Sequence, residues 1–218
     1  MKGFYTIFLC VFFLASCQTE EFTTVEGEEQ AVSFLQDQVL KGLLKSVTSR
    51  DGSFDDIVDR SSCFSINFPY TILLNGSPHQ VNTINDLYSI NPTDEVTPIA
   101  PFSITFATYN QLNVDSLEDF QNLVQLCDIG NLFNDAIKCI DLVYPIEVSL
   151  YDSENRSFDT LVFNHDKESF LSIDAFSENT LASINFPIEV ILHDLSVFQI
   201  ESNEGLKNVI LQEIPLCD

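Results

Sequence analysis

Phe186-Pro187-Ile188-Glu189-Val190 is one of four stretches in which an aromatic or apolar residue and a proline precede strictly alternating side chains. The other three are Phe68-Pro69-Tyr70-Thr71-Ile72, Ala100-Pro101-Phe102-Ser103-Ile104 and Tyr144-Pro145-Ile146-Glu147-Val148. Alternation of apolar and polar residues predicts strands with one buried and one solvent-exposed face. Because proline lacks the N–H that a strand ladder needs, we expect each proline at a bulge or with its nitrogen turned away from a neighbouring strand.

Each stretch is followed by signals for a turn, a shorter second strand and a helix start. Asn75-Gly76 is the clearest hairpin signal, and Gln111–Val114 and Val197–Ile200 are typical second strands. Each helix is expected to begin after a polar N-cap and to bury a large apolar residue four positions later. The N-caps are Thr83, Ser116, Asp166 and Ser202, and the apolar residues are Leu87, Phe120, Phe170 and Leu206.

These units predict an α+β fold of four tandem ββα repeats in two pairs, with a shared, mainly antiparallel sheet and helices on one face. Residues 63–127 form the first pair and residues 128–218 the second. Apolar residues at three- and four-residue spacing over residues 28–47 predict an amphipathic helix that packs on the folded body. Residues 48–60 are polar, contain Asp51-Gly52, and are interpreted as a linker.

Four cysteines mark the two pairs of repeats. Cys63 and Cys139 each stand six residues before a proline, and Cys127 and Cys217 close the second and fourth helices. In an oxidising compartment they should form two disulfides. We rank Cys63–Cys127 with Cys139–Cys217 first, because a duplicated two-repeat module had to be stable before it was doubled. Cys127–Cys139 with Cys63–Cys217 is the alternative, because only eleven residues separate Cys127 from Cys139.

The N-terminus has the pattern of an export signal. Met1-Lys2-Gly3 precedes an apolar run, residues 4–15, that is too short to span a bilayer. The run ends in Leu14-Ala15-Ser16-Cys17, which resembles a bacterial lipobox and implies that residues 1–16 are removed and Cys17 is acylated. The acidic residues that follow resemble the tethers of Bacteroidetes outer-membrane lipoproteins. We therefore expect residues 17–62 to hold the tether, helix and linker of a lipid-anchored outer-membrane protein displayed at the cell surface.

The charge excludes several classes of partner. The 218 residues include 9 Lys and Arg against 33 Asp and Glu, which gives a formal net charge of −24. Binding to nucleic acids or anionic lipids depends on clustered Lys and Arg, so we expect no nucleic-acid partner and membrane contact only through the lipid anchor.

No motif specifies a reaction. The three histidines are dispersed, no Gly-x-Ser-x-Gly elbow is present, and the acidic stretches 51–59 and 152–159 lack the EF-hand order, which leaves only weak calcium binding open. Glu147 and Glu189 occupy equivalent positions of two repeats. Their place in the alternation puts both on the solvent-exposed face of their strands, so they are interpreted as residues that keep the protein soluble. We therefore predict no catalytic residue, no metal ligand, no cofactor and a fold that does not depend on metal.

The aromatic residues are assigned mainly to the core. Phe68, Phe106, Tyr144 and Phe186 share the apolar parity of their strands. Carbohydrate platforms usually need an exposed Trp or Tyr, and the chain has no Trp.

A resemblance covers nearly the whole mature chain. Residues 51–59 running into Ser62-Cys63, the proline-anchored strands and the segment 184–188 resemble a family of secreted or lipid-anchored proteins of marine flavobacteria. The resemblance implies an envelope location and the repeat architecture, and it implies no activity. We predict a non-enzymatic structural or binding role. One alternative is an accessory lipoprotein that captures glycan or protein, which an exposed aromatic patch or a groove across the sheet would favour. The other is a hydrolase with a site that no motif reveals, which a deep pocket with two or more carboxylates within hydrogen-bond range would favour.

Overall fold

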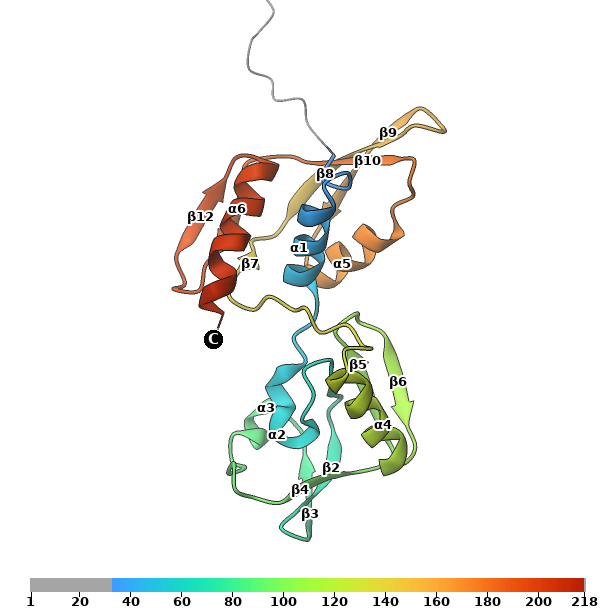
Figure 1. The fold of residues 1–218 in the computed structure, drawn as a ribbon, viewed down its shortest axis with the longest axis vertical. Helices are drawn as coiled ribbons and strands as arrows, with labels where there is room; N and C mark the ends of the chain where they lie inside the picture. Colours follow the sequence, from blue (N-terminus) through green and yellow to red (C-terminus); the bar gives the residue numbers. More distant parts are fainter. Residues whose placement is uncertain (1–32, 218) are drawn as a thin grey trace, which may run out of the picture. The chain divides into compact units, whose positions relative to one another are not determined.

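The computed structural model describes residues 33–217, which belong to the compact unit Val32–Asp218. It is a mixed α+β structure with antiparallel sheets and several helices. Two hydrophobic cores divide it into two lobes (Figure 1). We call residues 50–132 the N-lobe, and residues 33–48 together with 137–217 the C-lobe.

The N-lobe contains six strands and four short or medium helices among the described residues. In chain order they are η1 (Ser53–Asp55), α2 (Asp56–Asp59), β1 (Phe64–Ile66), β2 (Tyr70–Leu74), β3 (Ser77–Val81), α3 (Ile84–Leu87), β4 (Val96–Ile99), β5 (Phe102–Phe106), β6 (Gln111–Val114) and α4 (Leu117–Asp128). The C-lobe contains α1 (Gln38–Thr48), β7 (Asp141–Leu142), β8 (Ile146–Asp152), β9 (Ser157–Phe163), α5 (Asp166–Ala175), β10 (Thr180–Ile184), β11 (Ile188–Ile191), β12 (Val197–Ile200), α6 (Asn203–Glu213) and η2 (Ile214–Leu216).

The strands form four three-stranded antiparallel sheets, with orders β1-β5-β6, β3-β2-β4, β10-β8-β9 and β12-β11-β7. In each lobe the strand before one proline pairs with the strand after the other proline: β1 with β5, β4 with β2, β7 with β11 and β10 with β8. The expectation of one shared sheet is therefore wrong. Each of the four prolines lacks the backbone N–H that would continue the hydrogen-bonding of a strand. The strands before and after each proline accordingly belong to different sheets.

Helix α1 is shorter than the predicted helix over residues 28–47. It begins after Asp37, whose carboxylate accepts hydrogen bonds from the backbone N–H groups of Val39 and Leu40. Residues 28–32 lie outside the described residues. Leu40, Leu44 and Val47 lie in the C-lobe core, which confirms the prediction that the apolar stripe packs on the folded body.

Two ion pairs hold α1 between α5 and α6 (Figure 1). Lys45 Nζ lies 2.6 Å from Asp174 Oδ1 of α5, and Lys207 Nζ of α6 lies 2.9 Å from Asp37 Oδ2. The described part of the chain thus starts in the C-lobe at residue 33, forms the N-lobe, and returns to the C-lobe at residue 137.

The interpretation of residues 48–60 as a polar linker is wrong, because this segment folds into η1 and α2 and packs against the N-lobe. Asp55 and Asp59 are buried there. A Cβ at Gly52 would lie 2.6 Å from the carbonyl oxygen of Ser62 and 2.8 Å from that of Phe64. Only glycine allows this close return of the chain onto β1.

Most predicted helix starts and turns are present. Thr83, Ser116 and Ser202 are N-caps, β6 and β12 have the predicted bounds, and Asn75 and Gly76 link β2 to β3 with positive φ angles. The third of the four predicted helices, α5, differs from the prediction. Its N-cap is His165 rather than Asp166, and His165 Nδ1 accepts the N–H of Glu168 at 3.2 Å. The four apolar residues expected beneath the helices, Leu87, Phe120, Phe170 and Leu206, are all buried.

Each lobe contains one disulfide. Cys63 pairs with Cys127 and Cys139 pairs with Cys217, with Cα–Cα distances of 5.9 and 4.9 Å. This pairing is the one that we ranked first from the sequence, on the grounds that a duplicated two-repeat module had to be stable before it was doubled. No helix within residues 33–217 is long and apolar enough to cross a membrane.

Candidate functional site

A hollow of about 620 Å³ opens on the C-lobe where its two proline stretches cross, and its volume lies within the range of small-ligand sites. It is lined by the prolines, the aromatic residue before each and the glutamate two positions after each. The lining residues are Val143, Tyr144, Pro145, Glu147, Asn185, Phe186, Pro187, Ile188, Glu189 and Gln199.

The strand pattern places both glutamates on the outer surface. Glu147 lies between two buried residues of β8, and Glu189 lies between two buried residues of β11, so both side chains point outward. Backbone hydrogen bonds cross between the stretches: the N–H of Val143 donates to the carbonyl of Glu189, and that of Asn185 to the carbonyl of Glu147, each at 2.9 Å. Sequence reasoning noted that the glutamates are equivalent but not that the strand crossing brings them to one hollow.

The polar groups of the hollow are largely unused within the chain. Neither glutamate side chain makes a hydrogen bond or ion pair with any of residues 33–217. The Oδ1 atom of Asn185 accepts the hydroxyl of Ser149 at 2.8 Å, which leaves the amide NH₂ group as a donor. The hollow thus presents two carboxylates and an amide donor between aromatic and proline walls.

An exposed row of apolar side chains continues the same face of the sheet. Phe158 of β9 and Leu181 of β10 both lie directly opposite Tyr151 of β8. The rings of Tyr151 and Phe158 contact each other at a tilt, with centroids 4.7 Å apart, and Phe158 is 83 % exposed. Glu147 lies four residues earlier in β8, about 13 Å along the strand. Figure 1 shows the β8–β9 hairpin reaching out from the lobe.

The aromatic residues assigned to the core, Phe68, Phe106, Tyr144 and Phe186, are partly buried rather than fully buried and pack against the two cores. The hydroxyl of Tyr144 donates to Asp166 Oδ1 at 2.8 Å and accepts the hydroxyl of Ser169 at 3.0 Å. Burial raises the pKa of Tyr144 above its usual range. This side chain therefore stays neutral and forms a rigid wall of the hollow.

A second polar cluster is buried in the N-lobe. Asp55 Oδ2 accepts the N–H of Ile66 at 2.8 Å, and Asp59 Oδ1 accepts the N–H of Ser61 at 3.1 Å. The second carboxyl oxygens, Asp55 Oδ1 and Asp59 Oδ2, are buried without a hydrogen-bond partner among residues 33–217, as are the hydroxyls of Ser61 and Tyr70.

Burial raises the pKa of both carboxyls in this cluster. The pKa of Asp55 rises to about 7, and hydrogen bonding to Ile66 and the charge of Arg50 oppose this rise. The pKa of Asp59 rises to about 10, because burial is reinforced by the negative charge of Asp55.

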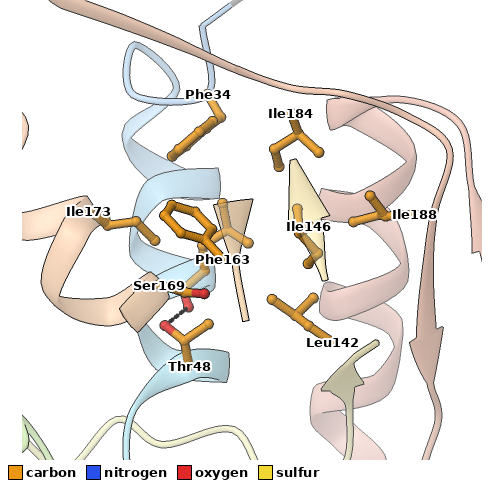
Figure 2. Close-up of a pocket in the computed structure, with 10 residues that line it drawn as sticks. Phe34, Thr48, Leu142, Ile146, Phe163, Ser169, Ile173, Ile184 and Ile188 are labelled. Carbon is orange, nitrogen blue, oxygen red and sulfur yellow. Dashed lines mark hydrogen bonds between the residues drawn. The ribbon is translucent and has the colours of Figure 1, made fainter. Parts of the chain in front are cut away.

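A cavity inside the C-lobe core is too small for a ligand (Figure 2). Its volume is about 10 Å³, room for one water-sized sphere, and its walls are almost wholly apolar. Its hydroxyls are engaged, since Thr48 donates to the carbonyl of Leu44 at 2.7 Å and Ser169 is bonded to Tyr144. It belongs to the core rather than to a site.

The remaining residues singled out from the sequence do not come together. Cys17 lies outside the described residues. His79 is exposed on β3, His165 caps α5, and His193 Nδ1 lies 2.7 Å from Glu213 Oε2. Within residues 33–217 no three His, Cys, Asp or Glu side chains form a group that could hold a metal ion.

The acidic loops satisfy their own backbone. Asp51 Oδ1 accepts the N–H of Ser53 at 2.8 Å, and Asp152 Oδ1 accepts that of Glu154 at 2.8 Å. These carboxylates form turns.

The chain matches no protein-family model, no curated protein and no solved structure.

Proposed function

We propose that this protein is a lipid-anchored binding protein of the outer membrane, displayed at the cell surface, whose C-lobe hollow captures a neutral glycan. Cys17 is its acylated first residue, and the body consists of four ββα units in two pairs, as in the flavobacterial proteins that the sequence resembles. The crossed strand pairing within each lobe supports the paired units.

One observation carries the assignment of the binding face. Two carboxylates and an amide donor with no role inside residues 33–217 lie on the same surface as the exposed ring of Phe158 and the half-buried ring of Tyr151. Carboxylate oxygens accept hydrogen bonds from sugar hydroxyls, and the face of an aromatic ring stacks on the apolar face of a pyranose. Phe158, backed by the half-buried ring of Tyr151, supplies an exposed ring in a chain that has no Trp.

Charge narrows the ligand class. The net charge of −24 and the two glutamates repel sulfated or uronic polysaccharides. A neutral glycan has hydroxyls to donate to both carboxylates and brings no opposing charge. Binding rather than hydrolysis is supported because neither glutamate has a side-chain partner within residues 33–217 that would orient it.

The test is a binding titration of the mature protein with a panel of neutral polysaccharides and a sulfated one. We expect a neutral glycan to bind and the sulfated polymer not to bind. Phe158→Ala and the Glu147→Gln/Glu189→Gln pair should each weaken binding about tenfold or more, as expected for the loss of about 1.4 kcal/mol.

Matched controls carry the same chemical changes elsewhere. Tyr88→Ala removes a ring that is 76 % exposed in the N-lobe, and Glu118→Gln/Glu178→Gln removes two other exposed charges. Both controls should bind like the unaltered protein. Failure of every neutral glycan to bind, or equal loss in site and control variants, would contradict the proposal.

A further inference from the structure

We propose that Asp55 and Asp59 share one proton, and that this shared proton stabilises the packing of residues 53–61 against the rest of the N-lobe. The inference is independent of the glycan site, because it concerns a different lobe and the stability of one segment.

The geometry of the segment leads to this proposal. Both carboxyls are almost completely buried, with exposed fractions of 0 and 1 %, and each uses one oxygen to accept a backbone N–H. The N–H bonded to Asp55 belongs to Ile66 of β1, so this carboxyl fastens η1 to the sheet. The remaining oxygens, Asp55 Oδ1 and Asp59 Oδ2, have no partner among residues 33–217.

Two buried carboxylates cannot both remain charged at low cost. In the proposed arrangement one added proton makes Asp59 Oδ2 a donor and Asp55 Oδ1 its acceptor, which would remove one of the two charges and give both oxygens a partner. The buried hydroxyl of Tyr70 has no hydrogen-bond partner among residues 33–217. Burial and the charges of both carboxyls raise its pKa, so it stays neutral and brings no positive charge to the pair.

Few other charges act on the pair. Arg50 and Asp56 are the other charged groups that shift the pKa values of Asp55 and Asp59. The guanidinium of Arg50 is also committed elsewhere, donating to the Ser65 hydroxyl and to the carbonyl of Thr105. It neutralises the pair only in part.

The elements packed on the segment add no counter-charge. Strands β1 and β4 carry no titratable side chain, and Asp86 of α3 accepts the backbone N–H groups of Asn82 and Thr83. Lys138, near Asp56, donates to the Ser53 hydroxyl at 2.7 Å. Neutralisation of the pair therefore falls to the proton.

The sign of the pH effect follows from linkage. The folded state holds the proton at pH values where the unfolded segment, with ordinary aspartate pKa values, has lost it. The stabilisation that the bound proton gives to the folded segment is greatest below pH 3.8, the pKa of an ordinary aspartate. It declines as pH rises toward about 10, the pKa of Asp59 in the folded protein. Opening of the segment should therefore become more frequent as pH rises.

Hydrogen exchange of the full mature chain tests the proposal. Protection factors of amides in residues 53–66, corrected for intrinsic exchange, should fall about tenfold for each pH unit between 7 and 9, above the pKa of Asp55 and below that of Asp59. Asp59→Asn replaces the shared O–H by an amide N–H and should remove most of this slope. Asp115→Asn, an exposed N-lobe change, should keep it.

Three outcomes would overturn the proposal. The first is protection that does not change with pH in the unaltered chain. The second is an Asp59→Asn slope equal to that of Asp115→Asn. The third is a rise in protection on adding Ca²⁺ at constant pH, which would assign the neutralising charge to a metal ion.

Discussion

The two lobes have the same crossed strand pairing, but they differ in the polar residues on the surface where their proline stretches cross. In the N-lobe the positions two residues after the prolines are Thr71 and Ser103, and the chain uses Ser103 in a hydrogen-bond network of its own. Asn67 donates to the Ser103 hydroxyl at 3.0 Å and accepts the Thr105 hydroxyl at 2.7 Å. In the C-lobe the corresponding residues, Glu147 and Glu189, have no side-chain partner within residues 33–217. Polar groups that a fold does not use are available to a ligand.

The largest effect should come from removing one disulfide at a time. The Cys63–Cys127 and Cys139–Cys217 bonds close loops of similar length, with separations of 64 and 78 residues. Loop entropy predicts that Cys63→Ala/Cys127→Ala and Cys139→Ala/Cys217→Ala each cost about 4 kcal/mol. Hydrogen exchange resolved by lobe should show the loss mainly in the lobe that lost its bond. Equal loss in both lobes for either variant would mean that the lobes do not hold their stability separately.

Glycine substitutions should then have opposite signs in the two lobes. A Cβ at Gly52 would meet the backbone of Ser62 and Phe64, so Gly52→Ala should destabilise the protein by about 1–3 kcal/mol. Gly42 lies in the middle of α1 with nothing within 4 Å of an added Cβ, so Gly42→Ala should stabilise by about 1 kcal/mol. Chemical denaturation measures both, and a tolerated Gly52→Ala would refute the close return of the chain onto β1.

The pH dependence of global stability should also separate the lobes. Because the folded N-lobe binds a proton that the unfolded chain has released, unfolding free energy should fall by up to about 1.4 kcal/mol per pH unit between pH 7 and 9, above the pKa of Asp55 and below that of Asp59. Asp59→Asn should flatten this slope relative to Asp115→Asn, which carries the same change in charge. Denaturation midpoints across that range provide the measurement, and parallel curves for the two variants would show that Asp59 is not the linked group.

The smallest effect on stability is expected at the hollow itself. Glu147→Gln/Glu189→Gln removes two exposed charges that have no side-chain partner within residues 33–217, so the unfolding free energy should change by no more than about 0.5 kcal/mol. Thermal melting is the measurement. A larger loss would indicate that these glutamates support the fold, as Asn67 and Thr105 do in the N-lobe.

Local features of the fold were predictable because they depend on neighbouring residues. The alternation around Ile146 and Val148, the Asn75-Gly76 turn and the caps Ser116 and Ser202 each specify their element within a few positions. The division into four sheets was not predictable, because the exchange of β1 and β4 is set by long-range pairing.

Buried charge was the other feature that sequence reasoning missed. The segment from Asp51 to Asp59 has the composition of an exposed linker, and nothing in its pattern separates the two buried aspartates from the exposed Asp56. The hollow was missed for a related reason. The parity of Glu147 and Glu189 correctly placed both on the outer surface, but only the crossing of the strands brings them to one site.

The most direct test of the central claim is mapping of amide chemical shifts of the mature protein during titration with the neutral glycan that binds best. If the hollow binds the glycan, perturbed amides should cluster at Glu147, Asn185, Glu189 and the Tyr151–Phe158 row, while those at Thr71 and Ser103 stay unchanged. Perturbations centred on the N-lobe, or spread evenly over both lobes, would contradict a glycan site in the C-lobe.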